Sequence, residues 1–133
     1  MSQHNITSQQ LDAILPVLDR VTAEGFTVGS WHSPPGQFPW FEFSQSVSEF
    51  QKALYDNGWI MPFDWGKWQD AARQYVEVPE KIESADATTI QKLLTTHARK
   101  ERFCEGHLAA MFENGHIVAL LRRLREIRRT MDT

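Results

Sequence analysis

The sequence predicts a single, mostly helical α+β domain of about six helices and one small antiparallel β-hairpin. Apolar residues recur at helical spacing in several separate segments, and most of these segments follow a capping residue. Two short runs rich in aromatic residues flank a Pro-Pro-Gly turn, which is the pattern of a hairpin. A length of 133 residues without a shift in composition indicates one domain, residues 1–133.

The first predicted helix begins near Thr7. Thr7 and Gln10 have the spacing of a capping box, and apolar residues then recur at helical spacing from Leu11 to Val21. Pro16 lies inside this pattern and predicts a kink or a local break, because proline lacks the backbone N–H of the helical ladder. Gly25 is the predicted end of the helix.

The predicted hairpin joins residues 26–32 (FTVGSWH) to residues 38–43 (FPWFEF) through a rigid loop. Pro39 cannot donate a ladder hydrogen bond, so the second strand is an edge strand or starts after this proline. A lone two-stranded hairpin is only marginally stable in water. We therefore expect helices to cover one of its faces.

Capping and stop signals divide the rest of the chain into helices. Ser46 and Glu49 repeat the capping-box spacing, and this helix ends at residues 57–58 (Asn-Gly). Asp64 is predicted to cap a helix that ends before Pro79, and Asp86 to cap the next one. Residues 103–114 are predicted to form a short helix stopped by a glycine, followed by a last helix from residue 117 to about residue 131.

Composition indicates the class of protein. Residues of hydrophobic type make up 41% of the chain, enough to bury a core without disulfides, and the single cysteine excludes an internal disulfide. No signal peptide pattern and no apolar run of about 20 residues is present, so we expect a cytoplasmic protein without a membrane partner. Net charge is −3, which does not favour nucleic-acid binding.

Three runs, together with the segment before them, carry a family resemblance. They are FDWGKWQ (residues 63–69), LLTTHARKERFCEGHL (93–108) and ENGHIVALLRRL (113–124), preceded by SEFQKALYDNGWIMPFDW (48–65). From Phe41 to the C-terminus the chain resembles a small prokaryotic family of domains of unknown function with comparable FDW, RFCEGHL and NG-bounded motifs. The resemblance implies a cytoplasmic prokaryotic protein, including one carried on a mobile element, and it transfers no catalytic residue.

The segment 95–117 holds the densest set of chemically active side chains. His97, Cys104 and His107 are ligands that a zinc-like metal accepts. On one continuous helix, however, His97 and Cys104 would lie about 10 Å apart along the axis, so a shared ion needs a break near residues 100–102. The favoured interpretation is structural, with His97 as a hydrogen-bonded histidine on a helix face and Cys104 as a small buried hydrophobe. We therefore predict no cofactor or metal.

A thiol enzyme is the second chemical alternative. Cys104 stands close to Glu105 and His107, and an imidazole three residues away on a helix can activate a thiol. Such local proximity is common by chance, and the chain has no nucleophile elbow, P-loop, Rossmann fingerprint or HExxH motif. A metal-dependent or hydrolytic enzyme using His97, Cys104, Glu105 and His107 is therefore the alternative to a non-catalytic protein.

The charged block that contains Arg102 and Glu105 has two interpretations. Arg99 and Arg102 could clamp an anionic group, because a guanidinium binds carboxylate or phosphate through two hydrogen bonds. The favoured prediction is an intramolecular network, with Arg102 and Glu105 forming a buried polar pair at the centre of the domain.

The last helix is rich in arginine. Arg122, Arg125 and Arg129 share one side of it, beside the apolar stripe, and could contact phosphates as a nucleic-acid regulator would. The favoured interpretation is a solvated face whose positive charge complements the helix dipole. Nucleic-acid binding is thus the second alternative function.

Five tryptophans in 133 residues could form an aromatic recognition surface, although aromatic filling of the space beneath the hairpin is the favoured interpretation. Trp31 and Trp40 flank the rigid hairpin loop. We predict a binding or interaction module whose partner is another protein or a second copy of the chain. The candidate binding residues are Trp31, Trp40, Asp64, Trp65, Arg102, Glu105 and His107.

Overall fold

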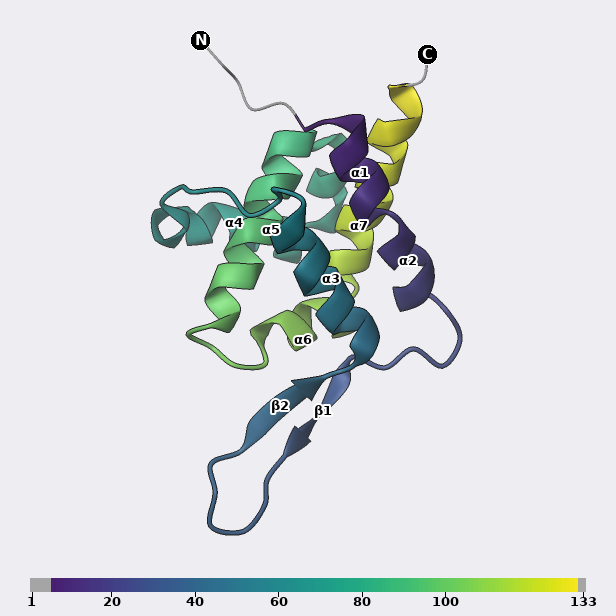
Figure 1. Cartoon of the computed structure of the whole chain (residues 1–133). Coiled ribbons are helices and arrows are strands. Elements are labelled where there is room, and N and C mark those ends of the chain that lie inside the picture. The colour runs from purple at the N-terminus through teal and green to yellow at the C-terminus, as the bar shows by residue number, and fades with distance from the viewer. Residues whose placement is uncertain (1–5, 132–133) are drawn as a thin grey trace.

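The computed structural model describes residues 6–131 and confirms the mostly helical α+β fold. Its described part contains seven α-helices, two 3-10 helices and one antiparallel hairpin (Figure 1). In chain order these elements are α1 (Ser8–Ile14), α2 (Pro16–Val21), β1 (Gly29–His32), β2 (Trp40–Phe43), α3 (Gln45–Asp56), η1 (Trp65–Trp68), α4 (Gln69–Glu77), η2 (Pro79–Ser84), α5 (Ala87–Glu101), α6 (His107–Glu113) and α7 (His116–Thr130).

The helices form one body, and the hairpin projects away from it (Figure 1). Helix α7 contacts α1, α2, α5 and α6, so its apolar stripe runs through the centre of the core. Its side chains there are completely or almost completely buried, and they meet the buried faces of α1, α3 and α5. The largest fully buried side chains of the core include Trp59, Phe50, Leu11, Ile90, Leu93, Ile117, Leu120 and Leu121.

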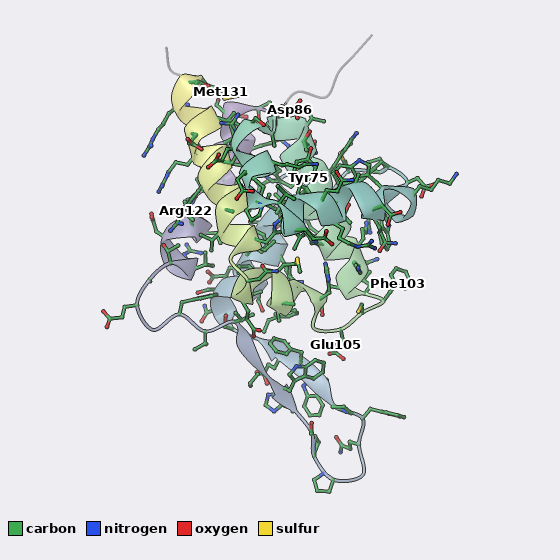
Figure 2. All side chains as sticks on the ribbon, turned by 180° about the vertical axis from the view of Figure 1, so that it is seen from behind. Tyr75, Asp86, Phe103, Glu105, Arg122 and Met131 are labelled. Atoms are coloured by element: carbon green, nitrogen blue, oxygen red, sulfur yellow. The ribbon has the colours of Figure 1, made fainter. Side chains whose placement is uncertain are left out.

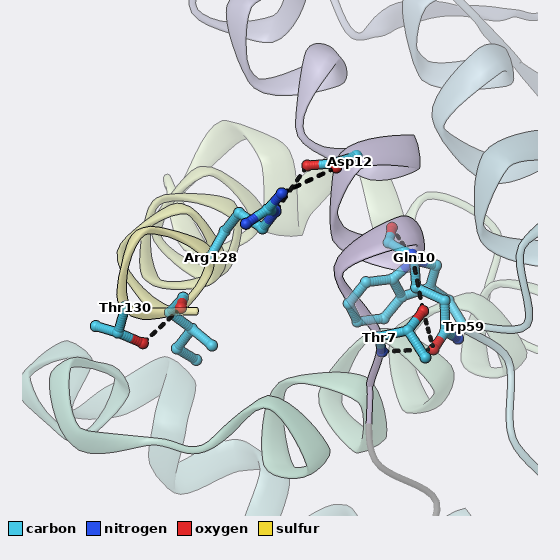
Figure 3. A network of polar contacts seen from close by, with 7 residues as sticks. Thr7, Gln10, Asp12, Trp59, Arg128 and Thr130 are labelled. Atoms are coloured by element: carbon cyan, nitrogen blue, oxygen red, sulfur yellow. Dashed lines mark hydrogen bonds and ion pairs between the residues drawn. The ribbon is translucent and has the colours of Figure 1, made fainter. Parts of the chain in front are cut away.

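Polar contacts fix the first helix to the segment that follows α3 (Figure 3). The predicted capping box is confirmed, since the Thr7 hydroxyl accepts from the Gln10 backbone and the Gln10 side chain accepts from the Thr7 backbone. Gln10 Nε2 also donates to the Asn57 carbonyl at 3.0 Å, and the buried indole of Trp59 donates to the Gln10 carbonyl at 3.1 Å. On the other side of α1, Asp12 accepts from Arg128 of α7 at 2.9 Å.

The hairpin pairs Trp31 with Phe41 and Ser30 with Glu42. Strand β2 begins directly after Pro39, as predicted, but both strands are shorter than the sequence runs that indicated them. Gly29 is required where it stands, because it has φ 141° and an added Cβ would lie 2.1 Å from the Glu42 carbonyl oxygen. The two backbones therefore approach closely at the base of the hairpin.

Several predicted boundaries need correction. Pro16 does break the first helix, and it starts α2 as the first residue of a new helix. The cap of α3 is Ser44 instead of Ser46, because Ser44 has the extended backbone that an N-cap needs and its hydroxyl accepts from Val47. Asp64 caps the 3-10 helix η1, and α4 starts only at Gln69.

The predicted helix over residues 103–114 is wrong in its first half. Residues 102–106 form a loop, and α6 begins at His107, because Gly106 has φ 95° and cannot continue a right-handed helix. The 3-10 helix η2 was not expected from the sequence. Among residues 6–131, no helix has the length and apolar character needed to cross a membrane.

Candidate functional site

Three histidines from three helices form a hydrogen-bonded chain inside the domain. His97 lies near the end of α5, His107 starts α6 and His116 starts α7. His97 Nδ1 lies 2.9 Å from His107 Nε2, and His97 Nε2 lies 3.0 Å from His116 Nε2. His97 and His116 are buried, whereas His107 is half-buried. The central ring thus uses both of its nitrogens for contacts with other histidines.

Burial keeps these three imidazoles neutral. The pKa of His97 is well below its usual value, first because of burial and then because of the neighbouring His116, His107 and Lys100 charges. Burial, followed by the charge of Lys100, lowers the pKa of His107 to about 4. Burial, followed by the charge of His107, lowers the pKa of His116 to about 4. At neutral pH each ring therefore offers one N–H donor and one acceptor nitrogen.

The exposed end of the chain opens into a cleft of about 240 Å³ between α4, α5 and α6. Its polar lining includes Gln69 and Arg73 from α4, Lys100 from α5 and His107 from α6. The other end of the chain borders a smaller cavity of about 110 Å³, which His116 lines together with Asn114. The histidine chain therefore connects two hollows on the molecule.

Cys104 and Glu105 do not join the histidines. Cys104 is exposed in the loop between α5 and α6, so the interpretation of it as a buried hydrophobe is wrong. Glu105 is also exposed, and its carboxylate turns to the hairpin. Of the metal candidates only His97 and His107 meet. Within residues 6–131 no group of three histidine, cysteine or acidic side chains converges as a metal site, since the His97 nitrogens point toward two different neighbours.

A second candidate site is the hairpin surface, by which we mean Trp31, Phe38 and Trp40 of the hairpin together with Phe103 of the loop between α5 and α6. These four side chains are large and apolar, yet they are 52%, 92%, 41% and 80% exposed, respectively. Trp40 stacks on His32, with ring centroids 5.1 Å apart, on the face of the hairpin opposite to Trp31, because successive strand residues alternate between faces. Such a concentration of exposed aromatic area is typical of a surface that contacts another molecule.

The α5–α6 loop anchors the hairpin to the helical body. The Phe41 backbone N–H donates to Glu105 Oε2 at 2.8 Å, and the Trp31 ring covers Gly106. Glu101 holds the loop itself, because its carboxylate accepts from the backbones of Gly106 at 3.1 Å and Leu108 at 2.8 Å. Figure 2 shows Glu105 on this loop next to the hairpin and Phe103 at its outer side.

The remaining predicted binding residues lie beside this loop. Trp65 and Arg102 line a shallow groove of about 400 Å³ together with Phe103, whose ring centroid is 5.9 Å from that of Trp65. Asp64 is exposed and caps η1 through the Lys67 backbone. The predicted buried pair of Arg102 and Glu105 is wrong, because both side chains are exposed and neither contacts the other. His107 faces the cleft and not the hairpin surface.

The arginines of the last helix do not form one free basic face. Arg122 and Arg129 are exposed, whereas Arg125 is partly buried. Arg122 also lines a hollow that holds three glutamates, Glu80, Glu83 and Glu126, and one further arginine, Arg123. This environment lowers the positive potential that a phosphate backbone would meet.

Sequence reasoning missed several residues of both sites. His116 belongs to the histidine chain, Arg73 and Lys100 to the cleft, and Phe38 and Phe103 to the hairpin surface. His116 had a weak signal, since it directly follows a helix-stopping glycine and so begins a helix as His107 does. Nothing in the spacing of Arg73, which lies 34 positions before His107, indicated that the two line the same cleft.

Comparison with known proteins gives a family and no activity. Neither a curated protein nor a solved structure matches the chain. A model described as a family of unknown function matches residues 6–130, which includes the N-terminal helices as well as the motifs after Phe41. The chain therefore belongs to the family of unknown function DUF6508.

Proposed function

We propose that this protein is a non-catalytic interaction module that docks a protein chain through its hairpin surface. The observation that carries the proposal is the hairpin itself, which projects from the helical body (Figure 1). Its Trp31, Phe38 and Trp40 side chains are exposed. The loop anchor at Glu105 and Gly106 holds strand β2 and the Trp31 ring in place, which lowers the entropy that binding must remove.

The partner that fits best is a second copy of the chain, paired through the outer edge of β1. Because the Phe41 N–H points outward to Glu105, the directly opposite Trp31 also points its N–H and C=O outward, on the other edge. No hydrogen bond within residues 6–131 uses that N–H. Edge strands normally carry charges or proline that oppose pairing. Strand β1 (GSWH) carries no proline, lysine or arginine, and its one titratable side chain, His32, contacts Glu42 of its own hairpin at 2.8 Å. Two β1 edges related by a two-fold axis would form a four-stranded sheet.

The alternative functions have less support from the geometry. A thiol enzyme needs an imidazole beside Cys104. The rings of His97 and His107 contact each other in the histidine chain, whereas Cys104 is exposed in the loop. A nucleic-acid regulator needs a free basic face, and Arg122 lies among glutamates. We therefore place the binding activity at the hairpin.

Sedimentation velocity over a range of concentrations tests the proposal. We place the two-fold axis at Ser30, so that Trp31 bonds to Gly29 of the second copy. We expect the wild-type chain to dimerise and Ser30→Lys to remain monomeric, because two lysines would then face one another across the new strand pair. The same lysine lies opposite Glu42 within its own hairpin, so the hairpin stays folded. Ser48→Lys, the same change on an exposed position of α3, is the matched control and should dimerise as wild type does.

A second pair of variants tests the aromatic contribution. Phe38→Ser should weaken the dimer, whereas Tyr55→Ser, which removes an exposed aromatic from α3, should not. A wild-type chain that stays monomeric up to about 1 mM has an association free energy weaker than about 4 kcal/mol. That result, or equal dimerisation of Ser30→Lys and wild type, overturns the proposal.

A further inference from the structure

The cleft between α4, α5 and α6 differs in charge from the rest of the protein. Every ionisable side chain that lines it is basic or a histidine, namely Arg73, Lys100, His97 and His107. This is notable in a chain of net charge −3, in which acidic residues outnumber basic ones. A hollow with only positive charge on its walls attracts an anion.

The two cations of the cleft are available to a ligand. Lys100 is half-buried and forms no ion pair or side-chain hydrogen bond within residues 6–131. Arg73 pairs with Asp70 at 3.3 Å, but the two side chains are 62% and 90% exposed, and such surface pairs contribute little. An anion in the cleft would therefore meet one unpaired ammonium and one guanidinium that can turn inward without a large loss.

The histidine chain adds an oriented donor. In a neutral chain, His116 can donate to His97 and His97 to His107, which places the His107 proton on Nδ1. No group within residues 6–131 accepts from that nitrogen. An anion near His107 favours donation in this direction, from His116 to His97 to His107, over donation in the opposite direction. In the favoured direction the positive end of each ring dipole points toward the negative charge.

The other wall of the cleft is apolar and the volume is small. Ala72, Val76 and Met111 line this wall. A volume of about 240 Å³ corresponds to roughly eight water molecules at about 30 Å³ each. The occupant that matches both walls is a small molecule with an anionic head and a short apolar tail.

We infer that this cleft binds a small organic anion, with a carboxylate or phosphate head held by Arg73, Lys100 and His107 and a short alkyl tail against Ala72, Val76 and Met111. Carboxylates and phosphates both bind to guanidinium and ammonium groups, which Arg73 and Lys100 supply here. This site lies apart from the hairpin surface and does not depend on the proposed docking.

Nuclear magnetic resonance titration of the imidazole signals tests the inference. The probes are butyrate, butyl phosphate, inorganic phosphate and, as a neutral match, butanol. We expect saturable shifts of the His107 and His97 ring signals with butyrate or butyl phosphate and none with butanol. Tighter binding of butyl phosphate than of butyrate assigns a phosphate head, and the reverse assigns a carboxylate. Equal affinity for inorganic phosphate and butyl phosphate would show that the apolar wall does not contribute to binding, which would contradict the alkyl-tail part of the inference.

Substitutions in the cleft test whether the changes in the imidazole signals come from binding there. Arg73→Gln with Lys100→Gln should weaken binding at least about tenfold, which is about 1.4 kcal/mol. Lys67→Gln, an exposed lysine on η1 outside the cleft, is the control and should bind as wild type does. Circular dichroism checks that all variants are folded, and sedimentation should show that the cleft variants self-associate as wild type does. No saturable shift with either organic anion, or equal binding by the double variant, overturns the inference.

Discussion

Gly106 shows how one residue couples the helical body to the hairpin. Its φ of 95° prevents a right-handed helix from running through residue 106, so α6 cannot start earlier. Its missing side chain leaves room for the Trp31 ring. A Cβ at this position would lie 2.9 Å from Trp31 Cζ2, closer than normal van der Waals contact. One glycine therefore decides both where α6 starts and how Trp31 is oriented.

We predict that Gly106→Ala destabilises the protein more than Gly25→Ala. Both glycines have positive φ, which costs a residue with a side chain about 1–2 kcal/mol, but nothing lies within 4 Å of a Cβ at Gly25. The difference in unfolding free energy, measured by urea denaturation, should be about 0.5–1 kcal/mol, typical of forcing a side chain off its preferred rotamer. In a Trp31→Ala background this difference should vanish. A difference that persists would mean that the Trp31 contact does not matter.

At the scale of elements, sequence patterns predicted some helix starts correctly and missed others. The capping box at Thr7 and the cap at Asp86 are confirmed, because a capping side chain acts on backbone groups within its own turn. The prediction failed at Ser46, where Ser44 also has the required hydroxyl, and at residues 103–106, where the positive φ of Gly106 keeps the chain out of the helix. Both errors concern the backbone conformation of single residues, which the spacing of apolar residues along the chain does not reveal.

The candidate sites were less predictable than the fold. Trp31 and Trp40 were expected to flank a hairpin and do, because hairpin pairing is local. The contact between His97 and His116, however, depends on how α5 packs against α7. Arg73 enters the cleft only through the packing of α4 on α5. Such contacts between distant segments depend on the whole set of packed helices, so spacing along the chain cannot supply them.

The anchor between the hairpin and the helices gives a prediction at this scale. Glu105→Ala removes the acceptor of the Phe41 N–H, so the Phe41 amide should exchange with solvent faster while α7 amides keep their protection. Glu105→Gln keeps a side-chain oxygen and should restore slow exchange at Phe41. Hydrogen exchange followed residue by residue measures both. Equal exchange in the alanine variant and wild type would show that the hairpin is held by its aromatic contacts alone.

At the scale of the whole molecule, the histidine chain links three helices and places titratable groups inside the core. His97 joins α5 to α6 through His107 and to α7 through His116, so proton binding at these rings opposes the packing of all three helices. In the unfolded chain the rings titrate near the ordinary value of about 6.5. In the folded chain burial lowers the pKa of both His107 and His116 to about 4 and that of His97 well below its usual value.

We predict that the free energy of unfolding is highest above about pH 6.5 and falls as the pH is lowered toward about 5. In this range the unfolded chain binds protons that the folded chain does not, and binding to the unfolded state alone destabilises the native state. A buried ring with a pKa of about 4, such as His116, should contribute a loss of up to about 2 kcal/mol at about pH 5, and the more exposed His107 less. Aspartate and glutamate titrate mostly below this range, so the histidines dominate it.

Urea denaturation at about pH 7, 6 and 5 measures the effect, and a variant assigns it to the histidine chain. His116→Gln removes one titrating ring and should reduce the proton uptake on unfolding by about one, whatever its effect on absolute stability. The slope of free energy against pH is therefore the informative quantity, since it does not depend on packing lost through the substitution. A wild-type slope near zero over this range would show that the folded chain protonates these rings as easily as the unfolded chain does. The three helices would then tolerate charge at their common junction, and the neutral, oriented histidine chain would no longer support an anion site in the adjoining cleft.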